Sequence, residues 1–100
     1  MVKHVILWQL KDEFSAEEKE NIKAGIKSGL EGLAGKIQGL TDIHVQTNGL
    51  ASSNVDVMLD STFESEEALK AYAVHPEHVK VADENVRPFT KSRSCLDFEI

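Results

Sequence analysis

The sequence predicts an α+β fold with the order β-α-β-β-α-β, in which a four-stranded antiparallel sheet carries both helices on one face. Three observations support this prediction. Four segments have the alternation or the apolar, β-branched composition of strands, and two have helical spacing behind a capping residue. The 100 residues suffice for one domain but not for two. We therefore expect residues 1–100 to form a single domain.

The first strand is expected over residues 2–10, where no glycine or proline interrupts a run that is apolar in the middle of both faces. Such a strand is typical of the centre of a sheet that is covered on both sides. Ser15 followed by Glu18 fits a capping box and predicts the start of the first helix. Apolar residues then recur every three or four positions along one helix face: Ile22, Ile26, Leu30, Leu33 and Ile37. Gly35 predicts the end of this helix.

The second and third strands are expected over residues 40–48 and 54–63. Both segments alternate apolar and polar residues, as strands with one covered face do. The dipeptide Asn48-Gly49 between them is a turn signal. The connection is short, so the two strands are expected to pair antiparallel.

The second helix is expected from residue 66 to about residue 74, behind Ser65 as its N-cap. Pro76 ends it, because the residue before a proline avoids the helical region. A short helical piece is expected over residues 77–86, and the last strand over residues 92–100. These elements complete the plan that is known as ferredoxin-like.

Two helices cover only one face of such a sheet, and the sequence predicts that the other face is apolar. The first strand is apolar on both faces, and Met58 adds to the second face of the third strand. An exposed apolar sheet face is an association site. We therefore expect a homodimer through the sheet face, closed into an α+β barrel. The alternative is a monomer whose open face is shielded by the tail or by long polar side chains.

Charge and composition exclude several classes of function. The chain carries 17 acidic and 11 basic residues, a net charge of −6, which argues against nucleic acid or an anionic membrane as partner. No apolar run is long enough for a signal peptide or a membrane span, so a cytoplasmic protein is expected. Cys95 is the single cysteine, which excludes an internal disulfide, and we expect a buried structural thiol. No glycine loop follows a strand, and no cofactor is predicted.

Three stretches of the sequence resemble the stress-responsive α/β-barrel (Dabb) domains. They are the opening MVKHVILWQLKDEFSAEE, the segment TFESEEALKAYAVHPEHVKV and the ending LDFEI. The resemblance covers nearly the whole chain and implies a dimeric α+β barrel. Members of the family include plant stress-associated proteins, uncharacterised bacterial proteins and polyketide cyclases of the olivetolic acid cyclase type.

The resemblance also implies a candidate site. In the cyclases, the tyrosine and the second histidine of Tyr-x-x-His-Pro-x-His are the catalytic pair, and the matching residues here are Tyr72 and His78. A neutral imidazole can take a C–H proton beside a carbonyl, and a tyrosine hydroxyl can donate a hydrogen bond to the enolate oxygen. His4 matches a further histidine of the cyclases, able to orient His78 or to contact substrate. The expected pocket lining is His4, Ile6, Ile22, Ile26 and His75.

Structural roles compete with catalysis for these residues. His75 could cap a helix end, and Tyr72 and His78 could hydrogen-bond each other in a packed core. His75 and His78 could also hold a metal together with Asp83 or Glu84, but a zinc site needs three or four converging ligands and Pro76 spoils the helical spacing. No metal is predicted.

Two functions therefore remain open at the level of sequence. The first is a homodimeric protein of unassigned activity that binds a small apolar ligand or acts in a stress response. The second is a cofactor-independent cyclase, lyase or isomerase with His78 as general base and Tyr72 polarising the carbonyl of a small carbonyl or polyketide-like substrate. An open cavity beside Tyr72 and His78 favours the enzyme, and a cavity filled by side chains favours the first function.

Overall fold

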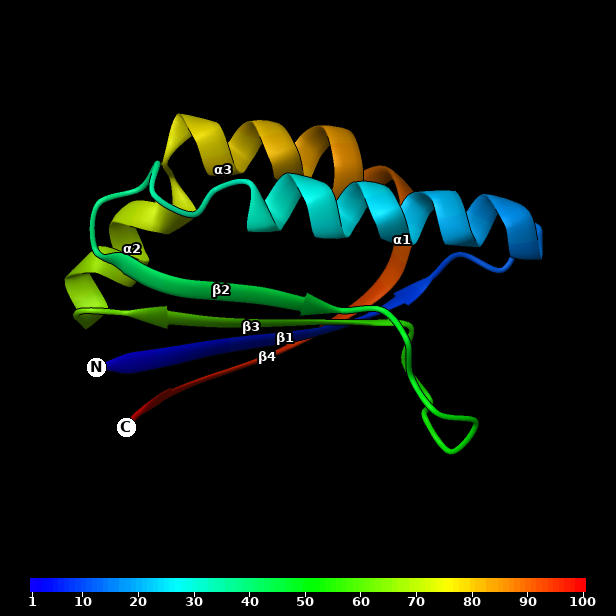
Figure 1. The fold of residues 1–100 in the computed structure, drawn as a ribbon, viewed down its shortest axis with the longest axis horizontal. Helices are drawn as coiled ribbons and strands as arrows, with labels where there is room; N and C mark the ends of the chain where they lie inside the picture. The colour runs from blue at the N-terminus through cyan, green and yellow to red at the C-terminus, as the bar shows by residue number, and fades with distance from the viewer.

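The computed structural model describes all 100 residues and confirms the predicted ferredoxin-like fold (Figure 1). The strands are β1 (Val2–Leu10), β2 (Leu40–Gln46), β3 (Val57–Phe63) and β4 (Thr90–Glu99). They form one antiparallel sheet in the order β2-β3-β1-β4. The helices are α1 (Ala16–Glu31), α2 (Glu66–Ala73) and α3 (Pro76–Val81), and all lie on one face of the sheet.

Strand β1 lies in the middle of the sheet, between β3 and β4. Its even-numbered residues from Val2 to Leu10 are buried beneath the helices, and its odd-numbered residues are half-buried on the opposite face. Ser61 on β3 is fully buried and donates a hydrogen bond to the backbone oxygen of His4 at 2.9 Å. The alternation of β1 therefore orients His4 and Ile6 toward the helices.

Helix α1 begins as predicted but ends earlier. The Ser15 hydroxyl accepts from the Glu18 backbone amide, and the Glu18 carboxylate accepts from the Ser15 amide, so the capping box is formed. The helix ends at Glu31, and turns lead on to β2. Gly35 and Gly39 in this connection have positive φ, which glycine adopts without a steric cost. Leu33 and Ile37 lie outside the helix and are nevertheless buried in the core.

Pro76 ends one helix and begins the next. The Ser65 side chain accepts from the Ala68 amide at the start of α2, and the His75 ring nitrogen Nδ1 accepts from the Glu77 amide at the start of α3. Proline suits the first turn of a helix because its missing N–H would have no partner there. Helix α3 continues into a π-helical turn, η1 (Ala82–Val86), and a 3-10 turn, η2 (Arg87–Phe89), that lead into β4.

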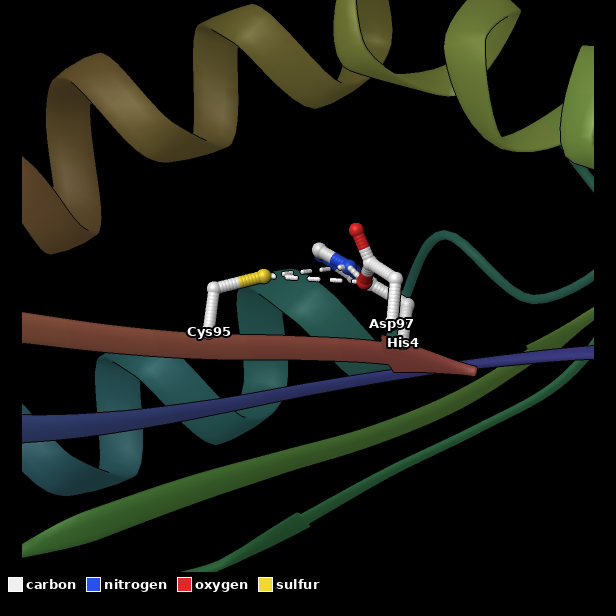
Figure 2. Close-up of side chains that lie close together, drawn as sticks. All are labelled: His4, Cys95 and Asp97. Atoms are coloured by element: carbon white, nitrogen blue, oxygen red, sulfur yellow. Dashed lines mark hydrogen bonds and ion pairs between the residues drawn. The ribbon is translucent and has the colours of Figure 1, made fainter. Parts of the chain in front are cut away.

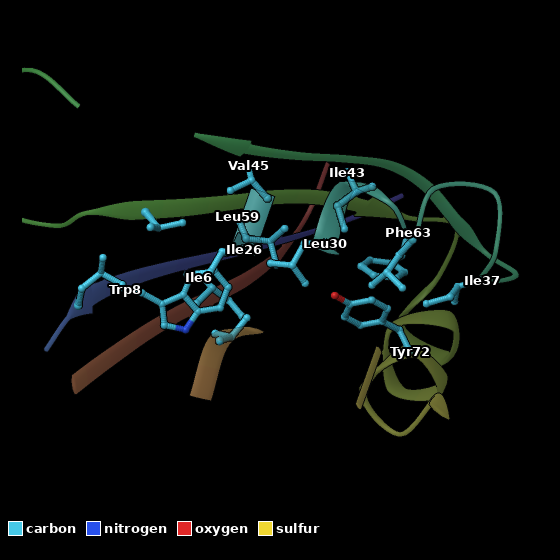
Figure 3. Close-up of a cluster of buried hydrophobic side chains, with 14 residues drawn as sticks. Ile6, Trp8, Ile26, Leu30, Ile37, Ile43, Val45, Leu59, Phe63 and Tyr72 are labelled. Carbon is cyan, nitrogen blue, oxygen red and sulfur yellow. The ribbon is translucent and has the colours of Figure 1, made fainter. Parts of the chain in front are cut away.

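The core lies between the helices and the sheet, where fourteen buried side chains form one cluster (Figure 3). Strand β4 stands outside this cluster as an edge strand, and every residue from Lys91 to Glu99 is exposed. The expectation of a buried Cys95 is therefore wrong, because this residue lies on the exposed edge strand. None of the helices combines the length and the apolar composition that crossing a membrane requires.

Candidate functional site

A cavity of about 670 Å³ lies on the helix-covered face of the sheet, between β1 and β4 on one side and α2, α3 and η1 on the other. Ile6, Trp8 and Leu59 are among its apolar lining residues on the sheet, and Val86 is one of those on the opposite side. Exposed residues of β4, including Arg93, also line it, so the cavity is open to solvent along the edge strand.

Tyr72 is one of the most deeply buried side chains beside this cavity, with 1% of its surface exposed. Its ring centre lies 4.9 Å from that of Phe63, 4.1 Å from that of His78 and 6.1 Å from that of His4. Its hydroxyl is buried and has no hydrogen-bond partner. Burial raises the pKa of Tyr72 far above its usual value, so the hydroxyl keeps its proton and is available as a donor.

His78 is a half-buried residue of α3 that lines the cavity beside Tyr72. Its Nδ1 atom is also buried without a hydrogen-bond partner. Burial lowers the pKa of His78 and outweighs the Ala73 backbone, which raises it, while the nearby guanidinium groups of Arg87 and Arg93 lower the pKa further. The imidazole is therefore neutral at neutral pH, the state in which it can accept a proton.

A second group of polar side chains lies on the floor of the cavity (Figure 2). His4 on β1 and Asp97 on β4 are direct cross-strand neighbours, and the His4 Nδ1 atom lies 2.5 Å from the Asp97 Oδ1 atom. The Cys95 sulfur lies 3.5 Å from the same oxygen and 3.8 Å from the same nitrogen. Sequence reasoning selected His4 but missed its two neighbours on β4. The alternation that puts Cys95 and Asp97 on one face of the last strand was the available signal.

The structure brings four of the predicted site residues to the cavity, namely His4, Ile6, Tyr72 and His78. His4 is bonded to Asp97 and not to His78. Tyr72 and His78 form no hydrogen bond with each other, although their rings are in contact. The alternative of a mutually satisfied pair in a packed core is therefore wrong.

The predicted lining by Ile22, Ile26 and His75 is not found. Helix α1 packs mainly against β2 and reaches the cavity only with Leu30, so Ile26 is buried completely in the core and Ile22 is half-buried against that core. His75 is occupied as the N-cap of α3. That bond also removes it from a metal site with His78, and the acidic residues considered with the two histidines do not form a ligand cluster.

Comparisons with known proteins agree with this architecture. The sequence pattern of the Stress responsive A/B Barrel Domain (Dabb) matches residues 2–100. A stress-response A/B barrel domain-containing protein of Arabidopsis thaliana is 30% identical over 102 residues, which cover 98% of this chain and 36% of that protein. The chain thus spans little more than a third of the length of this relative.

Solved structures of the same fold include proteins with and without known activity. A dimeric protein of unknown function from Bacteroides fragilis superposes with a TM-score of 0.92 at 33% identity, over 99% of this chain and 95% of that one. The hydroxynitrile lyase of Passiflora edulis superposes with a TM-score of 0.73 at 17% identity, over 99% and 92% of the two chains, a likeness of fold alone. The match of the family pattern to nearly every residue carries the assignment: the chain belongs to the stress-responsive A/B barrel (Dabb) domain family.

Proposed function

We propose that the cavity binds a small, largely apolar molecule that carries a carbonyl oxygen. The observation that carries this proposal is the pair of buried, unpartnered polar atoms, the Tyr72 hydroxyl and the His78 Nδ1 atom. Buried polar atoms in folded proteins nearly always have a partner, and here a ligand in the adjoining cavity can supply it. The apolar residues around the pair, such as Ile6 and Trp8, suit a ligand with a hydrocarbon body.

The charge states of the pair favour a neutral ligand group with an acceptor oxygen. Tyr72 stays protonated because burial raises the pKa of its hydroxyl, so it donates to the ligand. His78 stays neutral because burial lowers its pKa. It therefore offers no positive charge with which an anionic ligand group could pair. A carbonyl oxygen accepts from Tyr72, and the carbon beside it then lies near the imidazole.

The open cavity beside Tyr72 and His78 is the feature that favours a second candidate, a cofactor-independent lyase, cyclase or isomerase. His78 takes a proton from the carbon next to the carbonyl, the C–H electron pair forms a C=C bond, and the C=O π pair moves to the oxygen to give an enolate. The Tyr72 hydroxyl stabilises the enolate by a hydrogen bond, and the enolate then attacks an electrophilic carbon or takes the proton back at another atom. A hydroxynitrile lyase has this fold, so the fold is compatible with such chemistry. The specific support for this candidate is that the ring centres of Tyr72 and His78 lie only 4.1 Å apart.

Titration with a small diketone, pentane-2,4-dione, and with acetophenone tests both candidates. Histidine ring resonances report binding at His78, and deuterium uptake from heavy water into the probe reports proton abstraction. Tyr72→Phe removes one donor and is expected to weaken binding by about two- to tenfold. His78→Gln is expected to retain binding and to abolish the enhanced deuterium uptake.

His44→Gln is the matched control, because His44 lies on β2 outside the cavity. This variant is expected to bind and exchange like the unmodified protein. Binding with no enhanced exchange rejects the enzyme candidate and keeps the binding function. Equal affinity in Tyr72→Phe, or no change at the His78 ring, rejects the binding proposal.

We propose, in addition, that the chain forms a homodimer through the sheet face that the helices leave uncovered. Val5, Leu7 and Met58 are half-buried on that face, and Leu96 and Phe98 are 64% and 41% exposed on it. An apolar sheet face of this kind is stabilised by a self-complementary partner. The relative from Bacteroides fragilis, 33% identical, is described as dimeric.

A further inference from the structure

We propose that His4, Cys95 and Asp97 form a zinc-binding site whose fourth coordination position faces the cavity. The nitrogen, sulfur and oxygen ligand atoms lie within 4.8 Å of one another. This inference goes beyond the binding of a carbonyl compound: its three ligand atoms are separate from the Tyr72 and His78 atoms, and it shares with the proposed function only the unpartnered Tyr72 hydroxyl as a supporting observation.

The strand geometry explains why these three side chains converge. Cys95 and Asp97 are two residues apart on β4, so they project from the same face of the sheet. His4 is the cross-strand neighbour of Asp97 on β1, and its side chain projects from that face as well. Figure 2 shows all three side chains rising from the two strands toward the helices. Two ligands come from alternate positions of β4 and the third comes from the adjacent strand β1. Together they occupy three corners of a tetrahedron.

The distances between the ligand atoms are close to those that zinc requires. Zinc holds nitrogen and oxygen at about 2.0–2.2 Å and sulfur at about 2.3 Å, so ligand atoms of a tetrahedral site lie roughly 3.3–3.7 Å apart. The Cys95 sulfur lies 3.5 Å from the Asp97 oxygen and 3.8 Å from the His4 nitrogen. The third separation, 2.5 Å between His4 and Asp97, is a hydrogen bond and has to widen by about 1 Å. The Asp97 side chain is 44% exposed and has room to turn.

The donor set favours zinc over magnesium and calcium. Magnesium and calcium prefer oxygen ligands alone, whereas zinc accepts thiolate, imidazole and carboxylate together. A Cys95 thiolate and an Asp97 carboxylate balance the two positive charges of Zn²⁺, and a neutral His4 adds none. Binding replaces the thiol proton, so one proton is released to solvent for each zinc ion bound.

The fourth position is open to a molecule in the cavity. Three protein ligands with an open position are typical of zinc sites that bind water or substrate. The Tyr72 hydroxyl, unpartnered in a side chain that is 1% exposed, belongs to the same cavity, and its ring centre lies 6.1 Å from that of His4. A water or ligand oxygen on the metal is a partner for this hydroxyl. The orphaned donor is thus a second observation that favours an occupied site.

Cobalt(II) is the probe for this site, because zinc has no visible spectrum. The purified full chain is expected to bind one equivalent of Co²⁺ with a thiolate charge-transfer band in the near ultraviolet and with the visible bands of tetrahedral cobalt. Zn²⁺ should displace the cobalt. Losing a direct ligand costs more than losing an outer hydrogen bond, so Cys95→Ser should weaken binding at least about 100-fold and abolish the charge-transfer band.

Asp97→Asn keeps the size of the side chain and should weaken cobalt binding at least about tenfold while the charge-transfer band survives. The control is His44→Gln, which removes the other histidine–carboxylate pair, His44 and Asp42 at 2.8 Å, and should bind cobalt unchanged. Circular dichroism checks that each variant is folded.

Absence of the charge-transfer band in the unmodified chain, or equal affinity in Cys95→Ser, overturns the zinc site and leaves a hydrogen-bonded cluster. Loss of binding in His44→Gln overturns it as well, since the metal then sits elsewhere. Titration of the chelator-treated protein with pentane-2,4-dione tests ligand binding by Tyr72 and His78 separately. The zinc site and the binding of a carbonyl compound can therefore each be rejected without affecting the test of the other.

Discussion

At the scale of single residues, Glu31 shows how one carboxylate closes the free edge of the sheet. Its Oε2 atom accepts from the backbone amide of Val45 on β2 at 2.9 Å, and the Lys27 ammonium group donates to the Val45 carbonyl at 2.8 Å. Strand β2 is an edge strand, so these backbone groups have no strand partner on that side. The two side chains of α1 occupy hydrogen-bonding groups that another chain could otherwise pair with.

Glu31→Gln is expected to change how stability depends on pH. The hydrogen bond from Val45, assisted by Lys27, lowers the pKa of Glu31 below its usual 4.5. A carboxyl group with a lowered pKa in the folded state stabilises the fold above its unfolded pKa, and this contribution is lost as pH falls through the lowered value. Urea unfolding should therefore show a larger deficit for Glu31→Gln at pH 7 than at pH 3.5.

Glu64→Gln is the control for this experiment, because Glu64 is exposed and its side chain forms no hydrogen bond or ion pair. Its unfolding free energy should stay close to that of the unmodified chain at both pH values. A deficit of Glu31→Gln that is equal at pH 7 and pH 3.5 contradicts the role assigned to the carboxylate.

At the scale of elements, one of two neighbouring glycines of α1 sets the contact between this helix and the segment formed by α3 and η1. A Cβ atom at Gly29 would lie 2.9 Å from both the Asn85 amide nitrogen and a methyl of Val81. A Cβ atom at Gly25 would meet only the Asn85 amide nitrogen, at 3.9 Å. Asn85 cannot withdraw freely, because its amide donates to the Gly25 carbonyl at 2.9 Å. The close approach of the two helical segments therefore depends on Gly29.

Gly25→Ala and Gly29→Ala are expected to shift stability in opposite directions. Alanine gains about 0.5–1 kcal/mol over glycine in a helix interior, and at Gly25 nothing opposes this gain. At Gly29 the added methyl group displaces Val81 and Asn85, and overpacking of this kind costs about 1–3 kcal/mol. Gly29→Ala should therefore unfold at lower urea concentration than the unmodified chain, and Gly25→Ala at higher. The same midpoint for both variants would contradict the close contact.

The boundaries of the elements could be predicted wherever the signal is local. The Ser15 capping box and the proline at position 76 depend on neighbouring residues alone, and both are found where expected. Which strands α1 covers depends on contacts between distant segments, such as those of α1 with β2 and the hydrogen bond from Asn85 to Gly25. Periodicity shows that Ile26 is buried but cannot show against what, which is why the predicted lining was wrong.

The candidate site could be predicted in part from the sequence. Tyr72 and His78 were selected by resemblance, and both line the cavity. The neighbourhood of His4 was missed, because it depends on β1 and β4 being adjacent, on the register between them, and on the open space above the edge strand. A register of cross-strand pairs is a tertiary property, although the alternation of the last strand already put Cys95 and Asp97 on one face.

At the scale of the whole molecule, the two faces of the sheet differ in what covers them. The face under the helices holds the core and the cavity with Tyr72 and His78. The opposite face carries no helix (Figure 1), yet apolar side chains of β1, β3 and β4 lie on it. In the proposed homodimer, a two-fold axis presents each of these residues twice, so that a pair of chains would cover the face without any new element.

The proposed homodimer predicts a specific response to charge on this face. Leu96 is the cross-strand neighbour of Val5 on β1, and it is 64% exposed in the single chain. Leu96→Glu adds a carboxylate to each half of the interface, and two unpaired charges without water strongly disfavour association. Leu50→Glu is the matched control, since Leu50 lies in the β2–β3 connection and is 79% exposed. In sedimentation at micromolar concentration, the unmodified chain and the control should have about twice the mass of one chain, and Leu96→Glu should sediment as a monomer. A monomeric unmodified chain, or a Leu96→Glu variant that remains a dimer, would show that another surface or none joins the subunits.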